Sequence, residues 1–182
     1  SLIAAGLVSL ALAAPAMAER TARGSLLDTY LHARADDDAG RLEAAAEGYA
    51  TVLASRPADF ELGIQTMRQA VEAGDRALAV RTARTIDPRR LPADGKLLLI
   101  VDAVASRDWV AARDQIGRIG PEDPFDFLMP TIKAWVAFGA HDPNPLASLS
   151  GLPPESLAAS YAEEHRALLL LAMGRPKEGI DA

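Results

Sequence analysis

The chain has 182 residues, of which 49% are apolar and 24% charged, so it can bury a core and is not expected to be disordered. Its net charge of −6 argues against a general nucleic-acid binder, which would carry a basic surface. The absence of cysteine excludes disulfides, thiolate metal sites and a cysteine nucleophile. Only 5% of residues are aromatic while alanine is abundant, which favours closely packed helices over a β-sandwich.

The first residues, SLIAAGLVSLALAAPAMAER, are typical of a secretory signal. An uncharged apolar run from Leu2 to Ala14 precedes a proline and the small-x-small sequence AMA. This run is shorter than the roughly 20 residues that a membrane-spanning helix needs. We therefore predict that residues 1–18 are a signal peptide cleaved after Ala18, which places the mature protein in a bacterial periplasm or outside the cell. The alternative is an N-terminal helix of the core.

Five positions recur along the rest of the chain, each just after an apolar helical run: Gly40, Gly74, Arg107, His141 and Gly174. Successive members are 33 or 34 residues apart, which is a period typical of helical repeats. Glycine at such a position can adopt the left-handed conformation that ends a helix. The residues that follow are Arg41, Asp75, Asp108, Asp142 and Arg175. The three aspartates suit the first position of a helix, where a carboxylate accepts hydrogen bonds from free N–H groups.

Each recurring position is expected to separate the two helices of a pair. The expected pairs are 25–38 with 41–55, closed by Pro57; 60–73 with 75–86, closed by Pro88; and 94–106 with 109–119. A fourth first helix spans about 125–140, with Pro130 either as a kink or as the true start, and only a short turn follows it. A fifth runs over 155–173, and the chain stops inside its partner.

This pattern resembles the tetratricopeptide repeat (TPR) family. Ala33 matches the small residue of a first helix, and Pro57 matches the closing proline. The packing positions of a second helix are matched by Leu42, Ala45, Tyr49 and Val52, and again by Trp109, Ala112, Ile116 and Ile119. The small first-helix position recurs at Ala134 and Ala167, whereas Met67 and Ile100 depart from it. Unit two has a second helix about three residues short and unit four lacks most of its second helix, so units two and four could be looser hairpins.

The resemblance implies an all-α fold in which αα-hairpin repeats stack as a right-handed superhelical solenoid. It covers residues 25–182, which would hold about four and a half helix pairs truncated at the C-terminus. Such pairs share a core with their neighbours, so we expect the chain to be a fragment of a longer protein.

No residue pattern indicates an active site, a metal or a cofactor. The contiguous aspartates 36–38 lack the alternating ligands and distal glutamate of a calcium loop. The three histidines form no His-x-x-x-His pair, and no nucleophile elbow or phosphate-binding loop is present in the sequence. We expect that this chain is not an enzyme and that it binds neither a metal nor a cofactor.

The resemblance also implies that first helices line a concave face on which ligands lie. Counting from the small position, the candidate groove residues are Tyr30, Arg34, Arg68, Leu97, Val101 and Trp135. Arginine and aromatic residues are favoured as anchors of interfaces, so the expected partner is a protein or peptide. The alternative is that these six are ordinary packing or surface residues.

These observations predict an exported scaffold or adaptor for protein–protein interaction. A second hypothesis is the N-terminal helical region of a larger cell-envelope enzyme whose catalytic domain lies beyond Ala182. A third is a structural spacer without a dedicated ligand. The sequence downstream of Ala182 would discriminate the first two, because it would either continue the period or change to a catalytic pattern.

Overall fold

The computed structural model describes residues 24–180, which form helices joined by short connections and contain no β-strand. The all-α prediction is therefore confirmed for this part of the chain. Residues up to Pro88 belong to one compact unit and residues from Arg89 onward to a second. The predicted signal peptide lies outside the described residues.

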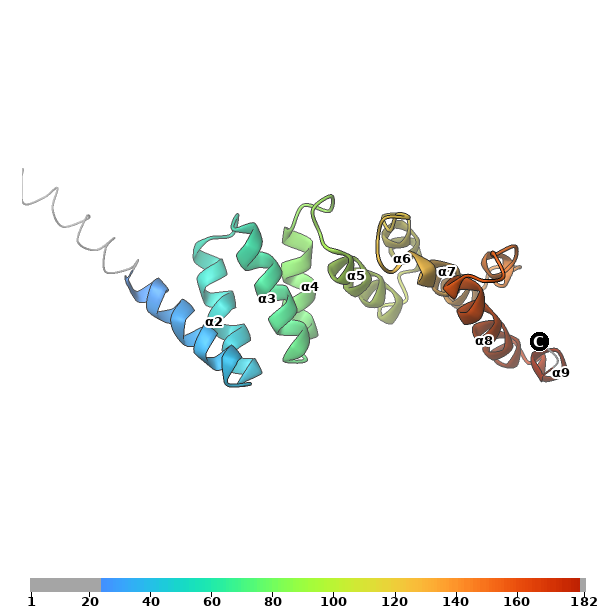
Figure 1. Cartoon of the computed structure of the whole chain (residues 1–182), viewed down its shortest axis with the longest axis horizontal. Helices are drawn as coiled ribbons and strands as arrows, with labels where there is room; N and C mark the ends of the chain where they lie inside the picture. The colour runs from blue at the N-terminus through green and yellow to red at the C-terminus, as the bar shows by residue number, and fades with distance from the viewer. Residues whose placement is uncertain (1–23, 181–182) are drawn as a thin grey trace, which may run out of the picture. The chain divides into compact units, whose positions relative to one another are not determined.

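The first unit consists of helices that pack on their neighbours in chain order (Figure 1). They are the helix over residues 24–38, α2 (Leu42–Ser55), α3 (Phe60–Glu72) and α4 (Arg76–Thr85). α3 lies between α2 and α4 and contacts both. Prolines 57 and 88 follow α2 and α4 by two or three residues, as predicted for residues that cannot continue a helix.

Small residues let the first two helices of this unit approach closely. Ala33 and Ala45 are fully buried beside the ring of Tyr49, in a cluster that also contains Val52 and Leu62. Gly48 faces Ala33 so closely that an added Cβ would lie 2.7 Å from the Ala33 Cβ. Small side chains on both helices therefore allow the close approach that buries the Tyr49 ring.

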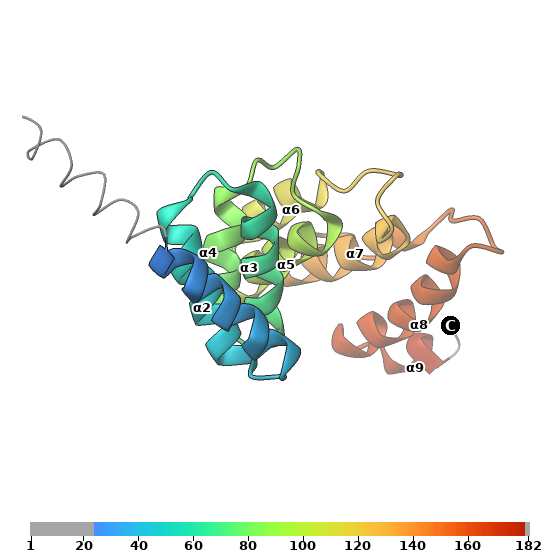
Figure 2. The same ribbon diagram turned by 60° about the vertical axis from the view of Figure 1, so that its left-hand side comes forward.

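The second unit continues with helices that again contact their chain neighbours. They are α5 (Ala93–Ala105), α6 (Trp109–Ile116), α7 (Met129–Gly139), α8 (Leu157–Ala172) and α9 (Pro176–Ile180). Two short 3₁₀ helices, η1 (Asp126–Leu128) and η2 (Ala147–Leu149), pack on both α7 and α8. The last two helices lie side by side in Figure 2.

Two apolar clusters form the core of the second unit. One joins α5, α6 and α7 through Ile100, Ala103, Ala112, Ile116, Ile119, Met129 and Val136. The other joins α7, η2 and α8 through Ala134, Leu149, Ala162 and Leu169. The predicted packing positions at Ala112, Ile116, Ile119 and Ala134 are thus buried.

All five recurring positions adopt the left-handed conformation. Their φ angles are 70° at Gly40, 74° at Gly74, 57° at Arg107, 58° at His141 and 74° at Gly174. At four of them the next residue donates its N–H to the carbonyl five residues back, as in Asp108 to Ala103 at 2.9 Å. This is the bond of a Schellman helix end. Arginine and histidine therefore occupy a conformation that only glycine adopts without strain.

Two of the three predicted aspartate caps are formed. Asp75 accepts from the Leu78 N–H at 2.9 Å, and Asp108 accepts from the Ala111 N–H at 3.0 Å. The prediction is wrong for Asp142, because no α-helix begins there. Its two carboxylate oxygens instead accept from Arg113 Nη2 at 2.9 Å each.

The structure also corrects the expected end of α6 and decides where α7 begins. α6 ends at Ile116 rather than at residue 119, because the chain then tightens into turns in which Arg118 bonds to Gln115 and Ile119 to Ile116. Pro130 lies in the first turn of α7, where its missing N–H leaves no helical bond unmade, so it marks the start of the helix and not a kink.

A candidate binding groove on the second unit

An apolar groove with a volume of about 530 Å³ runs between α5 and α7. Its lining is Leu97, Ile100, Val101, Val104, Ala105, Trp109, Ile132, Trp135, Val136, Phe138 and Gly139. We call this set the apolar groove. The two indole N–H groups are the only polar side-chain groups among these residues. The groove has a size usual for ligand sites and offers a partner mainly apolar contacts.

The helical repeat of α5 explains one wall of the groove. Leu97, Val101 and Val104 follow one another at spacings of four and three residues, which places them on one face of the helix. The side chain of Val101 is 58% exposed although it is apolar. The structure therefore brings three of the predicted residues, Leu97, Val101 and Trp135, to one concave surface.

The floor of the groove depends on a glycine of α7. A Cβ placed on Gly139 would lie 2.5 Å from the Cη2 atom of the Trp109 ring. The indole of α6 can therefore lie against the backbone of α7 only because position 139 has no side chain. Sequence reasoning assigned Trp109 to packing alone, and the structure adds that it also lines the groove.

Trp135 is held by a residue that the sequence did not single out. Its indole Nε1–H donates to Nδ1 of His165 on α8 at 3.0 Å, and the two rings meet edge to face at 89°. A second edge contact at 86° joins Trp135 to Phe138, another residue of the groove. The orientation of this tryptophan is thus fixed from two sides. Trp135 and His165 are 30 positions apart in the sequence, so no local pattern signals their contact.

The other three predicted residues lie in the first unit. Tyr30 is half-buried, with its ring centroid 5.9 Å from that of Tyr49, so it packs the helix pair. It also borders a cavity of about 360 Å³. Arg34 and Arg68 are exposed, on the first helix and on α3, and neither lines that cavity. A single groove that contains all six residues stays a prediction.

In the first unit, the hydroxyl of a buried tyrosine has a raised pKa. The Tyr49 hydroxyl donates to Oδ2 of Asp37 at 3.2 Å. Burial raises the pKa of Tyr49 from 10.0 to about 12, and the bond to the Asp37 carboxylate acts in the same direction. The phenol is therefore neutral throughout the physiological range.

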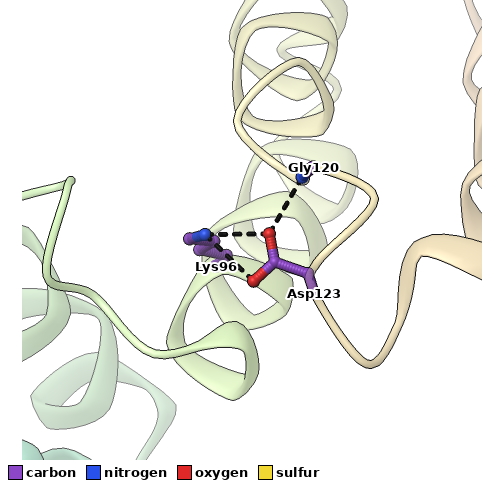
Figure 3. A network of polar contacts seen from close by, with 3 residues as sticks. All are labelled: Lys96, Gly120 and Asp123. Atoms are coloured by element: carbon purple, nitrogen blue, oxygen red, sulfur yellow. Dashed lines mark hydrogen bonds and ion pairs between the residues drawn. The ribbon is translucent and has the colours of Figure 1, made fainter.

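An ion pair fixes the connection between α6 and α7 to the start of α5 (Figure 3). Nζ of Lys96 lies 3.1 and 3.0 Å from the two Asp123 carboxylate oxygens, and both side chains are less than one-fifth exposed. The Gly120 N–H also donates to Asp123 at 2.9 Å. The Gly120 N–H first, and then Lys96, hold the pKa of Asp123 below its ordinary value. The ion pair thus anchors the connection between α6 and α7 to the helix that also carries Leu97 and Val101.

Residues 24–180 contain no group of three or more His, Asp or Glu side chains that could hold a metal ion. Within the same range, no helix has the length and apolar character to cross a membrane. Comparison with protein-family models, with curated proteins and with solved structures finds no match for the chain.

Proposed function

We propose that this chain is an exported helical-repeat protein of the TPR type that binds a protein partner and acts as a scaffold or adaptor in the periplasm or outside the cell. The observation that carries the proposal is the apolar groove, in which Leu97, Val101 and Trp135 meet. Its partner would insert uncharged apolar side chains.

The physical reason is the gain from removing apolar surface from water. Each square ångström of such surface contributes roughly 25 cal/mol when it is buried. The groove exposes Val101 and is also lined by two tryptophans, and the apolar centre of a protein interface is enriched in large aromatic residues. A charged ligand would lose hydration there and find no ionised side chain in the lining.

The repeat part of the proposal rests on the recurrence of one helix-ending turn. Left-handed residues at 40, 74, 107, 141 and 174 keep a spacing of 33 or 34, and a helix precedes each of them. Helical hairpins of this period, stacked in sequence, would form the right-handed superhelical solenoid that the TPR resemblance implies.

A pair of valines provides the test of the binding site. Val101→Glu places a carboxylate in the apolar groove, whereas Val110→Glu changes a 77% exposed valine of α6 outside the groove. Both variants and the wild type would be immobilised and exposed to a periplasmic extract of the source organism, with bound proteins measured by quantitative mass spectrometry. A protein partner of the groove is retained by the wild type and Val110→Glu, and it is lost with Val101→Glu. Equal retention by all three would refute the site.

The predicted basic residues are tested in the same assay. Arg34→Glu combined with Arg68→Glu reverses two charges on exposed side chains of the first unit. If the partner also reaches this unit, its retention falls while the helical circular dichroism stays unchanged. Unchanged retention would restrict the binding site to the apolar groove.

Export is tested separately, by determining the N-terminal residue of the protein isolated from its host. Cleavage after Ala18 gives a mature chain that begins at Glu19, as mass spectrometry of the periplasmic or secreted fraction would show. An intact N-terminus in that fraction would contradict the proposed signal peptide.

A further inference from the structure

The hydrogen bond between Trp135 and His165 requires one protonation state of the histidine. An indole N–H can only donate, so Nδ1 of His165 must accept, and the imidazole is then neutral with its proton on Nε2. When the ring takes up a second proton, both of its nitrogens become donors. Nδ1–H and the indole N–H would then point at each other, and the bond between them is lost.

The ring geometry makes the protonated state less favourable still. The 89° angle between the rings and the Nε1 contact show that the edge of the indole faces His165. The edge of an aromatic ring carries partial positive charge, whereas its face is negative. A histidine cation at this place would therefore gain no cation–π attraction from Trp135 and would be repelled by the N–H.

We propose that His165 is a positioning residue for the apolar groove and that its protonation releases Trp135, which weakens ligand binding at mildly acidic pH. This inference rests on the proposed function, since it concerns the same groove. Histidine is the side chain whose charge ordinarily changes between about pH 5 and 8. The coupling runs from α8 through Trp135 to Phe138, which also lines the groove.

Other ionisable groups lie on α8 and on the elements packed against it, so the test has to separate their effects from that of His165. On α8 itself the ionisable residues are Tyr161, Glu163, Glu164 and Arg166. The elements packed against α8 add Lys133 on α7, Asp126 on η1, and Lys177 and Glu178 on α9. The 3₁₀ helix η2 has no ionisable residue. Arg166 donates to the Leu149 carbonyl, and Glu178 is paired with Arg175. The comparison of the wild type with His165→Asn, which leaves all of these groups in place, separates the response of His165 from theirs.

Nuclear magnetic resonance tests the contact directly. The chain has two tryptophans, so a spectrum of ¹⁵N-labelled protein contains two indole N–H signals, which Trp135→Phe assigns. Between pH 7.5 and 5.5 we expect the Trp135 signal to shift to the position of a weaker hydrogen bond. In His165→Asn it should not move, because the asparagine Oδ1 accepts the same bond without titrating. A Trp135 signal that does not respond to pH in the wild type would overturn the proposal.

Binding of Nile red, a neutral dye that fluoresces in apolar sites, tests the consequence. We expect its dissociation constant to rise roughly three- to tenfold from pH 7.5 to 5.5, the loss of about one hydrogen bond. His165→Asn should keep the tight value at both pH values, and His165→Leu should show the weak value at both. His141→Asn is the matched control, because asparagine tolerates the left-handed backbone there and the wild-type pH response should persist.

Two failures can be told apart. If Val101→Glu leaves Nile red binding unchanged, the dye does not use the apolar groove and the proposed binding site itself is contradicted. If Val101→Glu abolishes binding but His165→Asn keeps the wild-type pH response, the groove stands and the role of His165 is refuted.

Discussion

The two units differ in what the cavity around Tyr30 and the apolar groove present to a ligand. The cavity around Tyr30 in the first unit is bordered by Arg56, Asp59 and Glu61. The apolar groove of the second unit has no charged residue in its lining. Charged borders keep water bound, whereas an apolar lining gains free energy when a partner displaces water. Similar helical hairpins thus leave one cavity in which charged residues join an apolar lining and one groove without charged residues, and the second is the better candidate for binding.

The difference begins with how closely the helices approach. In the first unit Gly48 and Ala33 are in direct contact, and the ring of Tyr49 is completely buried beside them. In the second unit Trp109 occupies the space over Gly139 and leaves the α5 side of the groove open. Substitutions in each unit test this difference in packing.

Gly48→Ala should have the largest effect on folding. The new methyl would lie 2.7 Å from the Ala33 Cβ, and two backbones must separate to admit it. We expect a loss of roughly 1–3 kcal/mol in the free energy of unfolding, measured by urea denaturation. Gly24→Ala is the control, because its methyl would meet no atom within 4 Å. Equal stability of the two variants would show that the first unit is not closed by this contact.

Asp123→Asn should have the second-largest effect, a loss of stability in the second unit. It removes the charge partner of a largely buried lysine, which we expect to lower the free energy of unfolding by roughly 1–2 kcal/mol at pH 7. Because the folded state lowers the pKa of Asp123, its contribution is present above pH 3.8 and is lost as pH falls below that value. In urea titrations the difference between wild type and variant should therefore shrink as the pH is lowered below 3.8. Glu122→Gln, an exposed neighbour, should match the wild type throughout.

Tyr49→Phe tests the polar pair of the first unit. Near neutral pH the loss of one hydrogen bond to Asp37 should lower the free energy of unfolding by about 0.5–1.5 kcal/mol. The folded state raises the pKa of the phenol from 10.0 to about 12, so its contribution is complete below pH 10 and disappears as pH rises through 12. The wild type should lose stability over this interval more steeply than Tyr49→Phe. If both follow the same alkaline curve, the buried hydroxyl is not responsible.

Arg107→Gly should have the smallest effect and the opposite sign. The first unit uses glycine at both of its left-handed turns, whereas the second places arginine at φ 57°. Removing this strain should stabilise the protein by a few tenths to about 1 kcal/mol, as thermal unfolding would show. The reciprocal change, Gly74→Arg, should destabilise by a similar amount. A melting temperature that falls in Arg107→Gly would mean that the arginine side chain contributes more than its backbone strain removes.

Much of the helical framework could be predicted because its signals are local. The left-handed turns at Gly40 and Gly174, and the caps at Asp75 and Asp108, depend on residues within one turn of each helix end. Asp142 was mispredicted because a carboxylate serves equally well as a cap and as an ion-pair partner, and Arg113 lies 29 residues away in sequence.

The apolar groove was predictable only in part, because some of its contacts join residues that are far apart in the sequence. The repeat resemblance predicted that Leu97, Val101 and Trp135 share one concave face, and the structure places all three in the lining of the groove. It could not show that Trp109 reaches the groove, because that depends on the missing side chain of Gly139. The contact of Trp135 with His165 joins two helices 30 residues apart and follows from packing alone.

The central claim, that the apolar groove binds a protein partner, is tested most directly by photo-crosslinking in the source organism. A photoreactive amino acid would replace Val101 in the groove or Val110 on the exposed face of α6. We expect a discrete crosslinked polypeptide at position 101 that is absent at position 110 and lost when Trp135→Ala is added. Crosslinks of the same polypeptide at both positions, or at position 110 alone, would contradict it.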